Sequence, residues 1–268
     1  MIYLKKKASY LTFNAGLDIG SCYCKCVVIN ENKEIIATSI SPLGGNPRNA
    51  SKLTFENALK SANLKSKNIK NIVCVGRNRK KVSFKSHEES EIKCIAKGAR
   101  ELIPSLRTIV DLGALTNKAI KLNSNGKVVD YVINDKCASG SGMFLELVAK
   151  ALEMDISDID KKAKMSENPL PITNQCSIFA ESEVIYLVNE GKNEIDIIAG
   201  VTNSIANRIY SLLKRVNMEK DIILTGGVAN TNYIKLKLEE RLNMEIKEPT
   251  ISPIYIAAFG ASLYASEI

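Results

Sequence analysis

One pattern occurs twice in this sequence, and it restricts the possible folds more than any other feature. The first copy is Leu17–Gly20 followed by Lys25, and the second copy is Val110–Gly113 followed by Lys118. In both copies the lysine stands seven residues after the aspartate of an Asp-x-Gly turn. Each copy predicts a strand, a tight turn and a returning strand. A duplicated unit of this kind indicates two similar α/β lobes.

Hydrophobic periodicity and turn residues place further strands and helices around the two copies. The expected strands are 14–17, 25–30, 34–40, 72–75, 107–110, 118–122, 128–133 and 221–224. The expected helices are 51–62, 88–102, 142–152, 157–165, 178–190, 194–216, 231–242 and 253–265. We therefore expect a first lobe over residues 1–103 and a second lobe over residues 104–252. A C-terminal helix within residues 253–268 is expected to pack back on the first lobe.

The charge of the chain is basic. Its 268 residues include 37 Lys and Arg residues against 29 Asp and Glu residues, which gives a net charge of +8. A basic balance is compatible with nucleic acid or with an acidic partner. Because the basic residues are spread along the chain and no nucleic-acid-binding motif accompanies them, we expect no nucleic-acid binding.

The sequence carries no signal for a membrane or for export. No apolar run approaches the roughly 20 residues of a membrane-spanning helix. The basic stretch Met1–Lys7 lacks the apolar segment and the cleavage site of a signal peptide. We therefore expect a cytoplasmic protein that does not bind membranes. In that reducing compartment its seven cysteines are expected to be free, metal-bound or catalytic.

The duplicated turns predict phosphate binding. Glycine lets the backbone approach a phosphate closely, with N–H groups directed at the anion. An aspartate can hold the water shell of a magnesium ion that bridges phosphates. Asp18 and Asp111 are therefore the candidate catalytic residues, and Mg²⁺ is an expected cofactor. The candidate binding residues around them are Gly20, Ser21, Lys25, Gly113, Ala114 and Lys118. A single Asp-x-Gly is as readily an ordinary turn, and the duplication is what favours a nucleotide.

A third turn, Thr225–Asn230, ends an expected strand and contains paired glycines that permit close approach of an adenosine. The candidate residues there are Gly226, Gly227, Val228 and Asn230. Together with the duplicated hairpins, this turn resembles the superfamily of sugar kinases, actin and DnaK-type chaperones. The resemblance implies a duplicated two-lobe, actin/hexokinase-like (ribonuclease H-like) ATPase fold with ATP between the lobes.

Two cysteines share a setting that suits a metal–sulfur cluster. Cys137 and Cys176 each stand in a polar loop directly before an expected helix. Helix N-termini carry partial positive charge, which favours thiolates and anionic clusters. A 4Fe–4S cluster needs four thiolates, and a twofold homodimer would supply two from each chain. The residues alone leave open that both cysteines are small buried hydrophobes.

The other cysteines and the single histidine are less informative. Cys22, Cys24 and Cys26 alternate, so they are expected on one face of a strand, as core packing or as a metal site. Cys74 and Cys94 are expected in the core. His87 is expected to be exposed at a helix start, and one histidine excludes a His-rich metal site within the chain.

The segments around the two loop cysteines resemble a known family. Asn134–Glu146 and Cys176–Ile185 closely resemble the BadF/BadG/BcrA/BcrD-type ATPases, in particular the activators of 2-hydroxyacyl-CoA dehydratases. The resemblance extends over about residues 16–265. Further matching stretches are Gly76–Arg77, Ser90–Ile92, Gly98–Ala99, Ile195–Gly200 and Thr225–Ala229.

This resemblance implies a specific activity. The family members are homodimers that bind ATP in each subunit and share one 4Fe–4S cluster at their interface. Electrons arrive from ferredoxin or flavodoxin, and ATP hydrolysis drives a low-potential electron into a partner dehydratase-type or reductase-type iron–sulfur enzyme. Cys137 and Cys176 match the family's cluster ligands.

The sequence departs from the family pattern at the second phosphate loop. Leu115 stands where the family has Gln, and Cys22 stands where it usually has Thr. Ile254 and Ala257 replace a Gln and a Gly near the C-terminus. We therefore expect ATP binding with slowed hydrolysis. Two further interpretations are an ATPase subunit of a benzoyl-CoA-reductase-like complex and a nucleotide-binding regulatory protein of the same fold.

Overall fold

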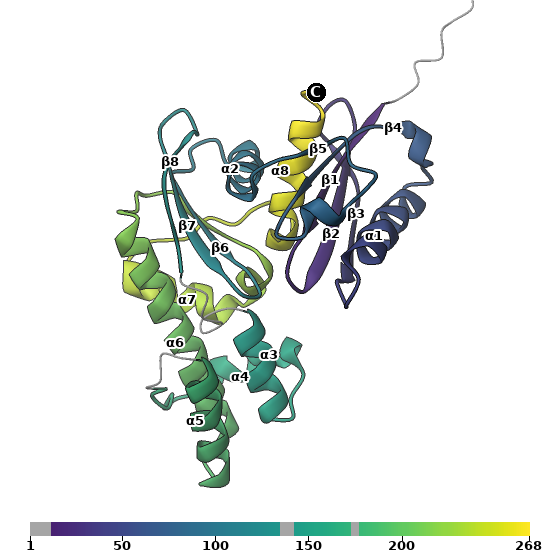
Figure 1. Ribbon diagram of the computed structural model, residues 1–268. Helices are drawn as coiled ribbons and strands as arrows, with labels where there is room; N and C mark the ends of the chain where they lie inside the picture. Colours follow the sequence, from purple (N-terminus) through teal and green to yellow (C-terminus); the bar gives the residue numbers. More distant parts are fainter. Residues whose placement is uncertain (1–11, 135–141, 173–176) are drawn as a thin grey trace, which may run out of the picture. The chain divides into compact units, whose positions relative to one another are not determined.

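The computed structural model describes residues 12–134, 142–172 and 177–268. Contacts divide these residues into two compact units. The first unit contains the described residues up to Cys94 together with Ala257–Ile268, and the second contains Ile95–Ile256. Each unit is built on one β-sheet with helices packed against it (Figure 1). The predicted α/β class is confirmed.

The sheet of the first unit has the strand order β3-β2-β1-β4-β5. Its strands are β1 (Phe13–Ile19), β2 (Tyr23–Ile29), β3 (Ile35–Pro42), β4 (Ile69–Val75) and β5 (His87–Glu88). The first three strands form an antiparallel meander, whereas β4 runs parallel to β1. The helical elements of this part of the chain are α1 (Pro47–Ser61), η1 (Ser66–Asn68), η2 (Arg79–Lys81), the start of α2 (Glu91–Leu102) and α8 (Ile256–Ala265).

Helices α1 and α8 pack on the two faces of this sheet (Figure 1). Helix α1 begins where the Asn46 side chain accepts hydrogen bonds from two backbone N–H groups, and Pro47 fits the first turn because it has no N–H to satisfy. It packs Phe55 and Leu59 into the core. Helix α8 approaches β1 so closely that a Cβ at Gly16 would lie within 3.0 Å of its backbone.

The sheet of the second unit has the order β8-β7-β6-β9. Its strands are β6 (Thr108–Leu112), β7 (Asn117–Leu122), β8 (Val128–Ile133) and β9 (Ile222–Thr225). Its helical elements are α3 (Gly142–Ala151), η3 (Ile156–Asp158), α4 (Ile159–Lys164), α5 (Ser177–Asn189), α6 (Glu194–Arg215), η4 (Gly227–Asn230), α7 (Asn232–Leu242) and η5 (Pro253–Tyr255).

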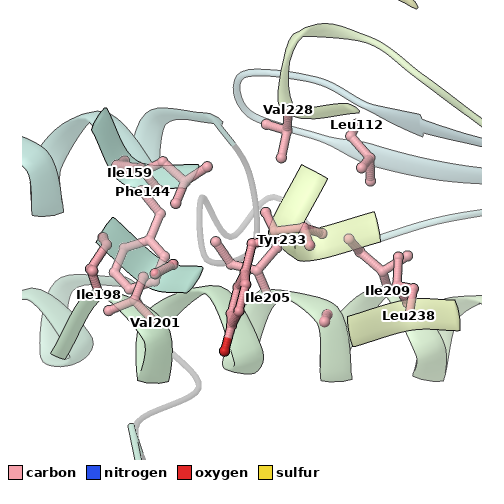
Figure 2. Packing of buried hydrophobic residues seen from close by; sticks show 14 of the residues in the cluster. Leu112, Phe144, Ile159, Ile198, Val201, Ile205, Ile209, Val228, Tyr233 and Leu238 are labelled. Carbon is pink, nitrogen blue, oxygen red and sulfur yellow. The ribbon is translucent and has the colours of Figure 1, made fainter. Parts of the chain in front are cut away.

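One hydrophobic core joins the helices of the second unit to its sheet (Figure 2). Phe144 of α3 and Ile159 of α4 are fully buried against α6. Leu112 at the end of β6 and Val228 in η4 belong to the same core. The ends of two strands, where functional residues are expected, therefore rest on the best-packed part of this unit.

The two sheets repeat the same plan. In each, three antiparallel strands are followed by a fourth strand that pairs in parallel with the first of the three. The units differ in what connects the third and fourth strands. The first unit uses α1 with the short η1, whereas the second inserts α3, η3, α4, α5 and α6.

The structure corrects three local predictions. His87 does not start a helix: it lies exposed on β5 and pairs with Val73, and α2 begins at Glu91. This short strand depends on a tertiary partner, which local periodicity does not reveal. The helix expected over 157–165 divides into η3 and α4, and the last helix is preceded by η5.

We expect Gly16→Ala to lower the free energy of unfolding by about 3 kcal/mol or more, because the added methyl group meets backbone atoms that have no room to move. Gly45→Ala is the matched control, since nothing lies within 4 Å of a Cβ there. Urea denaturation measures both. Equal stability of the two variants would contradict the close approach of α8.

Candidate functional site

The duplicated aspartate and lysine form an ion pair in each unit. Lys25 Nζ lies 2.9 Å from Asp18 Oδ2, and Lys118 Nζ lies 2.7 Å from Asp111 Oδ2. In both hairpins the two residues are direct cross-strand partners. The spacing of seven residues therefore places each carboxylate opposite its ammonium group. All four side chains are almost entirely buried, so each charge depends on its partner.

A tight turn follows each aspartate. The Gly20 N–H donates to the Tyr23 carbonyl at 3.0 Å, and the Gly113 N–H donates to the Thr116 carbonyl at 3.1 Å. A Cβ at Gly113 would lie 2.7 Å from the Thr116 oxygen, so the second turn requires glycine. The turn residues Ser21 and Ala114 are partly exposed. The structure therefore places the predicted phosphate-binding residues of each unit together at one sheet end.

A second pair of glycines was only half recognised from the sequence. Gly76 follows β4 and Gly226 follows β9, and both have φ +86. A Cβ at Gly76 would lie 2.6 Å from Asp18 Oδ1, and one at Gly226 would lie within 3.0 Å of the Leu112 carbonyl oxygen. Gly76 is thus the counterpart of Gly226. Aligning the two repeats beyond their hairpins would have identified it.

In the second unit, three segments meet at the hairpin. The N–H groups of Gly142 and Met143 donate to the carbonyls of Gly113 and Ala114, both at 3.0 Å. A Cβ at Gly142 would lie 3.3 Å from the side chain of Val228. The second phosphate hairpin, the start of α3 and the glycine-rich turn therefore form one compact group.

The predicted adenosine residues differ in what they can offer a ligand. The Val228 side chain is buried in the core, so only its backbone can serve a ligand. Asn230 is exposed, and its amide donates to the Gly227 carbonyl at 3.2 Å. Gly227 is exposed, and a Cβ there would meet Ile254, one of the residues that depart from the family pattern, at 3.6 Å.

Positive charge gathers beside the first hairpin. The Asn78 side chain donates to the Gly20 carbonyl at 2.9 Å, which ties the segment after β4 to the first turn. Arg77, Lys80 and Lys81 in this segment are exposed. Such a group raises the local concentration of anions, which suits a phosphate ligand.

The two cysteines predicted to hold a cluster, Cys137 and Cys176, lie outside the described residues. Within the described residues, no group of three or more His, Cys, Asp or Glu side chains could hold a metal ion. This applies to the alternative metal site at Cys22, Cys24 and Cys26.

The cysteines of the first unit serve the core, as the packing interpretation predicts. Cys24, Cys26, Cys74 and Cys94 are fully buried. Cys22 differs, because it lies in the turn before β2 and is partly exposed. Burial raises the pKa of Cys24 to about 11 and that of Cys74 to about 12, and it also raises the pKa of Cys26. These thiols therefore remain protonated and unreactive at neutral pH.

We expect the buried thiols to resist iodoacetamide in the folded protein. At pH 8 a thiol with a pKa of about 11 is ionised in about one molecule in a thousand, and the reactive thiolate gains population only as the pH rises toward that value. Mass spectrometry after alkylation should find Cys22 modified before Cys24 and Cys74. Unfolding in urea is the control, since it should make all of them reactive. Equal labelling of Cys22 and Cys24 in the folded protein would be inconsistent with this packing.

The helices of the structure carry no membrane signal: among the described residues, none is both long and apolar enough to cross a bilayer.

Comparison with known proteins adds the context of this arrangement. Residues 15–265 match the model of the BadF/BadG/BcrA/BcrD ATPase family. The 2-hydroxyisocaproyl-CoA dehydratase activator of Clostridioides difficile is 36% identical, with 94% of each chain covered. A subunit of the benzoyl-CoA reductase of Thauera aromatica is 29% identical, with 96% of this chain and 94% of the relative covered.

Solved structures give the same result for the fold. The activator of the Clostridium difficile 2-hydroxyisocaproyl-CoA dehydratase with bound ADPNP superposes with a TM-score of 0.90 at 35% identity, covering 96% of this chain and 95% of that chain. A glucokinase of the ROK family from Streptomyces griseus has a TM-score of 0.58 at 10% identity, covering 96% of this chain and all of that chain (100%). The second likeness concerns the fold alone, and it confirms the predicted hexokinase-like architecture.

Proposed function

The chain belongs to the BadF/BadG/BcrA/BcrD ATPase family, and from this premise we propose that it is an ATP-dependent electron-transfer activator. As a homodimer it holds one 4Fe–4S cluster and passes a low-potential electron to a partner iron–sulfur enzyme of the 2-hydroxyacyl-CoA dehydratase type. Ferredoxin or flavodoxin supplies the electron. The observation that carries the proposal is the duplicated, buried Asp–Lys pair beside a glycine turn in each unit.

The first hairpin supports binding of ATP with magnesium. Asp18 Oδ1 is buried and has no hydrogen-bond partner among the described residues. A buried carboxylate oxygen without a partner is costly, so its position indicates a ligand that donates to it. The water shell of a magnesium ion is such a donor, and the ion would offset the negative charge of the phosphates. Gly76 leaves space in front of Asp18 Oδ1, because any side chain there would fall on this oxygen.

The lysines and the turns have complementary tasks. Lys25 and Lys118 hold their carboxylates in place, since each forms the buried partner of one aspartate. The turns at Gly20 and Gly113 bring backbone close to the phosphates. The turn from Gly226 to Asn230 holds the adenosine. These are the assignments that the sequence predicts, and the local geometry of each unit is compatible with them.

The positions of the two loop cysteines support a shared cluster. Cys137 lies between β8 and α3, and Cys176 directly precedes α5. Two thiolates per chain meet the requirement for four only if a second copy contributes the others. Helix α5 exposes Phe179, Ile185 and Tyr186, and a helix with an apolar outer face favours a partner. A second copy at α5 would be consistent with sharing of a cluster beside Cys176.

Two other functions have a specific observation in their favour. The likeness to a benzoyl-CoA reductase subunit favours a permanently bound ATPase subunit of a reductase complex. Leu115 in the second turn favours a regulatory protein that binds nucleotide and hydrolyses it weakly. Co-purification with a large partner distinguishes the first alternative. A preparation without iron–sulfur absorption would favour the second.

Cys137→Ser and Cys176→Ser should each abolish cluster binding in anaerobic reconstitution, because each dimer would lose two of its four thiolates. Cys22→Ser should reconstitute normally and is the matched control. Iron analysis of the wild-type protein should approach four irons per two chains. A fully occupied cluster in either loop variant would refute the ligand assignment, and four irons in each chain would refute sharing.

Leu115→Gln should raise the steady-state rate of ATP hydrolysis on the order of 100-fold while nucleotide affinity stays unchanged. Glutamine can orient an attacking water by hydrogen bonding, whereas leucine has neither donor nor acceptor. Leu115→Met is the control, because it retains an apolar side chain. A rate that stays the same or falls in Leu115→Gln would count against this role.

A further inference from the structure

The two repeated carboxylates have different neighbours on the parallel strand beside them. Thr225 on β9 is the cross-strand partner of Asp111, and Val75 on β4 is the cross-strand partner of Asp18. Thr225 is 1% exposed and Val75 is fully buried. The two side chains have nearly the same shape, but only threonine carries a hydroxyl group. The repeat therefore contains one chemical difference beside otherwise matching ion pairs.

In the second unit this difference occupies both oxygens of the carboxylate. Lys118 Nζ donates to Asp111 Oδ2 at 2.7 Å, and Thr225 Oγ1 donates to Asp111 Oδ1 at 3.0 Å. The Val110 carbonyl lies 3.5 Å from the same hydroxyl, so Asp111 is its better acceptor. With a donor on each oxygen, the plane of the Asp111 carboxylate is fixed.

In the first unit only one oxygen has a donor. Lys25 Nζ donates to Asp18 Oδ2 at 2.9 Å, whereas Asp18 Oδ1 has no partner among the described residues. Asp18 is 5% exposed, so bulk water does not replace the missing donor. The methyl groups of Val75 cannot donate, and Gly76 places no side chain in front of this oxygen. Asp18 thus keeps one buried acceptor for a ligand.

We propose that Thr225 and Val75 are positioning residues that assign different tasks to the two repeated aspartates. This inference rests on the proposed binding of magnesium nucleotide. Val75 leaves Asp18 Oδ1 free to accept a hydrogen bond from the hydrated magnesium ion. Thr225 fixes Asp111 and keeps it from becoming a second carboxylate of the same kind, so that Asp111 acts in turnover from one orientation. The residue on the parallel strand beside each aspartate, rather than the Asp-x-Gly motif, sets which half of the repeat serves the metal.

Two exchanges copy each unit's residue into the other. Val75→Thr places a hydroxyl donor on Asp18 Oδ1 and should raise the magnesium concentration for half-maximal nucleotide binding about tenfold, the factor expected when a hydrogen bond to a charged group is lost. Binding of nucleotide without magnesium should be unchanged. Val73→Thr is the matched control, because Val73 is equally buried on the same strand but pairs with Gly16.

Thr225→Val removes the donor to Asp111 and should lower kcat for ATP hydrolysis about tenfold with little change in KM. Thr225→Ser retains the hydroxyl and should restore kcat. Thr202→Val is the control, since it removes another fully buried hydroxyl of the second unit, one that bonds only within α6. Fluorescence titration with a nucleotide analogue, with and without magnesium, measures binding independently of turnover.

The outcomes separate this inference from the function on which it rests. Wild-type protein that binds no nucleotide in either titration would overturn both. Wild-type binding with the same magnesium dependence in Val75→Thr, or an equal shift in Val73→Thr, would overturn the inference alone. So would a Thr225→Val variant that matches Thr202→Val in kcat, or one that Thr225→Ser fails to rescue.

Discussion

The structure depends on burying a carboxylate and an ammonium group together at the end of a strand pair, and doing so twice. Removing both charges from water is costly, and the cost is offset only when the partners face each other at hydrogen-bond distance. The hairpin register meets this condition, because Asp18 lies opposite Lys25 and Asp111 opposite Lys118. A slip of one residue would send the lysine to the other face of the sheet. The tight glycine turn and the packed strand ends follow from the need to keep that register.

Much of the fold was predictable because the strands and helices follow clear local patterns. The duplicated hairpins, the long helix α6 and the glycine-rich turn after β9 all lie where the sequence predicts them. What the sequence did not reveal depends on partners far away in the chain. His87 pairs with β4, Gly76 stands in front of Asp18, and Thr225 donates to Asp111. Parallel pairing joins segments more than 50 residues apart, and no local periodicity encodes its register.

The comparison of the units also separates what the repeat provides from what the insertion provides. Both sheets supply a buried aspartate, a lysine and a glycine turn, which suits two similar contacts with one phosphate-bearing ligand. The residues proposed for the redox task, Cys137 and Cys176, both lie in the stretch between β8 and β9 that holds the inserted helices. The insertion is anchored to the repeat, because the first N–H groups of α3 donate to the second turn. Nucleotide and cluster are thus proposed for neighbouring parts of a single packed unit.

The departures from the family pattern fall on side chains, whereas the retained features depend mainly on backbone. Close approach of a phosphate requires glycine at the turns and the carbonyl and amide positions that glycine permits. Those glycines are present, and their surroundings leave no room for a side chain at Gly76, Gly113 or Gly226. Orientation of an attacking water, in contrast, requires a polar side chain, and Leu115 does not supply one. Binding and hydrolysis therefore depend on different parts of the same turn, and a change at Leu115 can alter the second without altering the first.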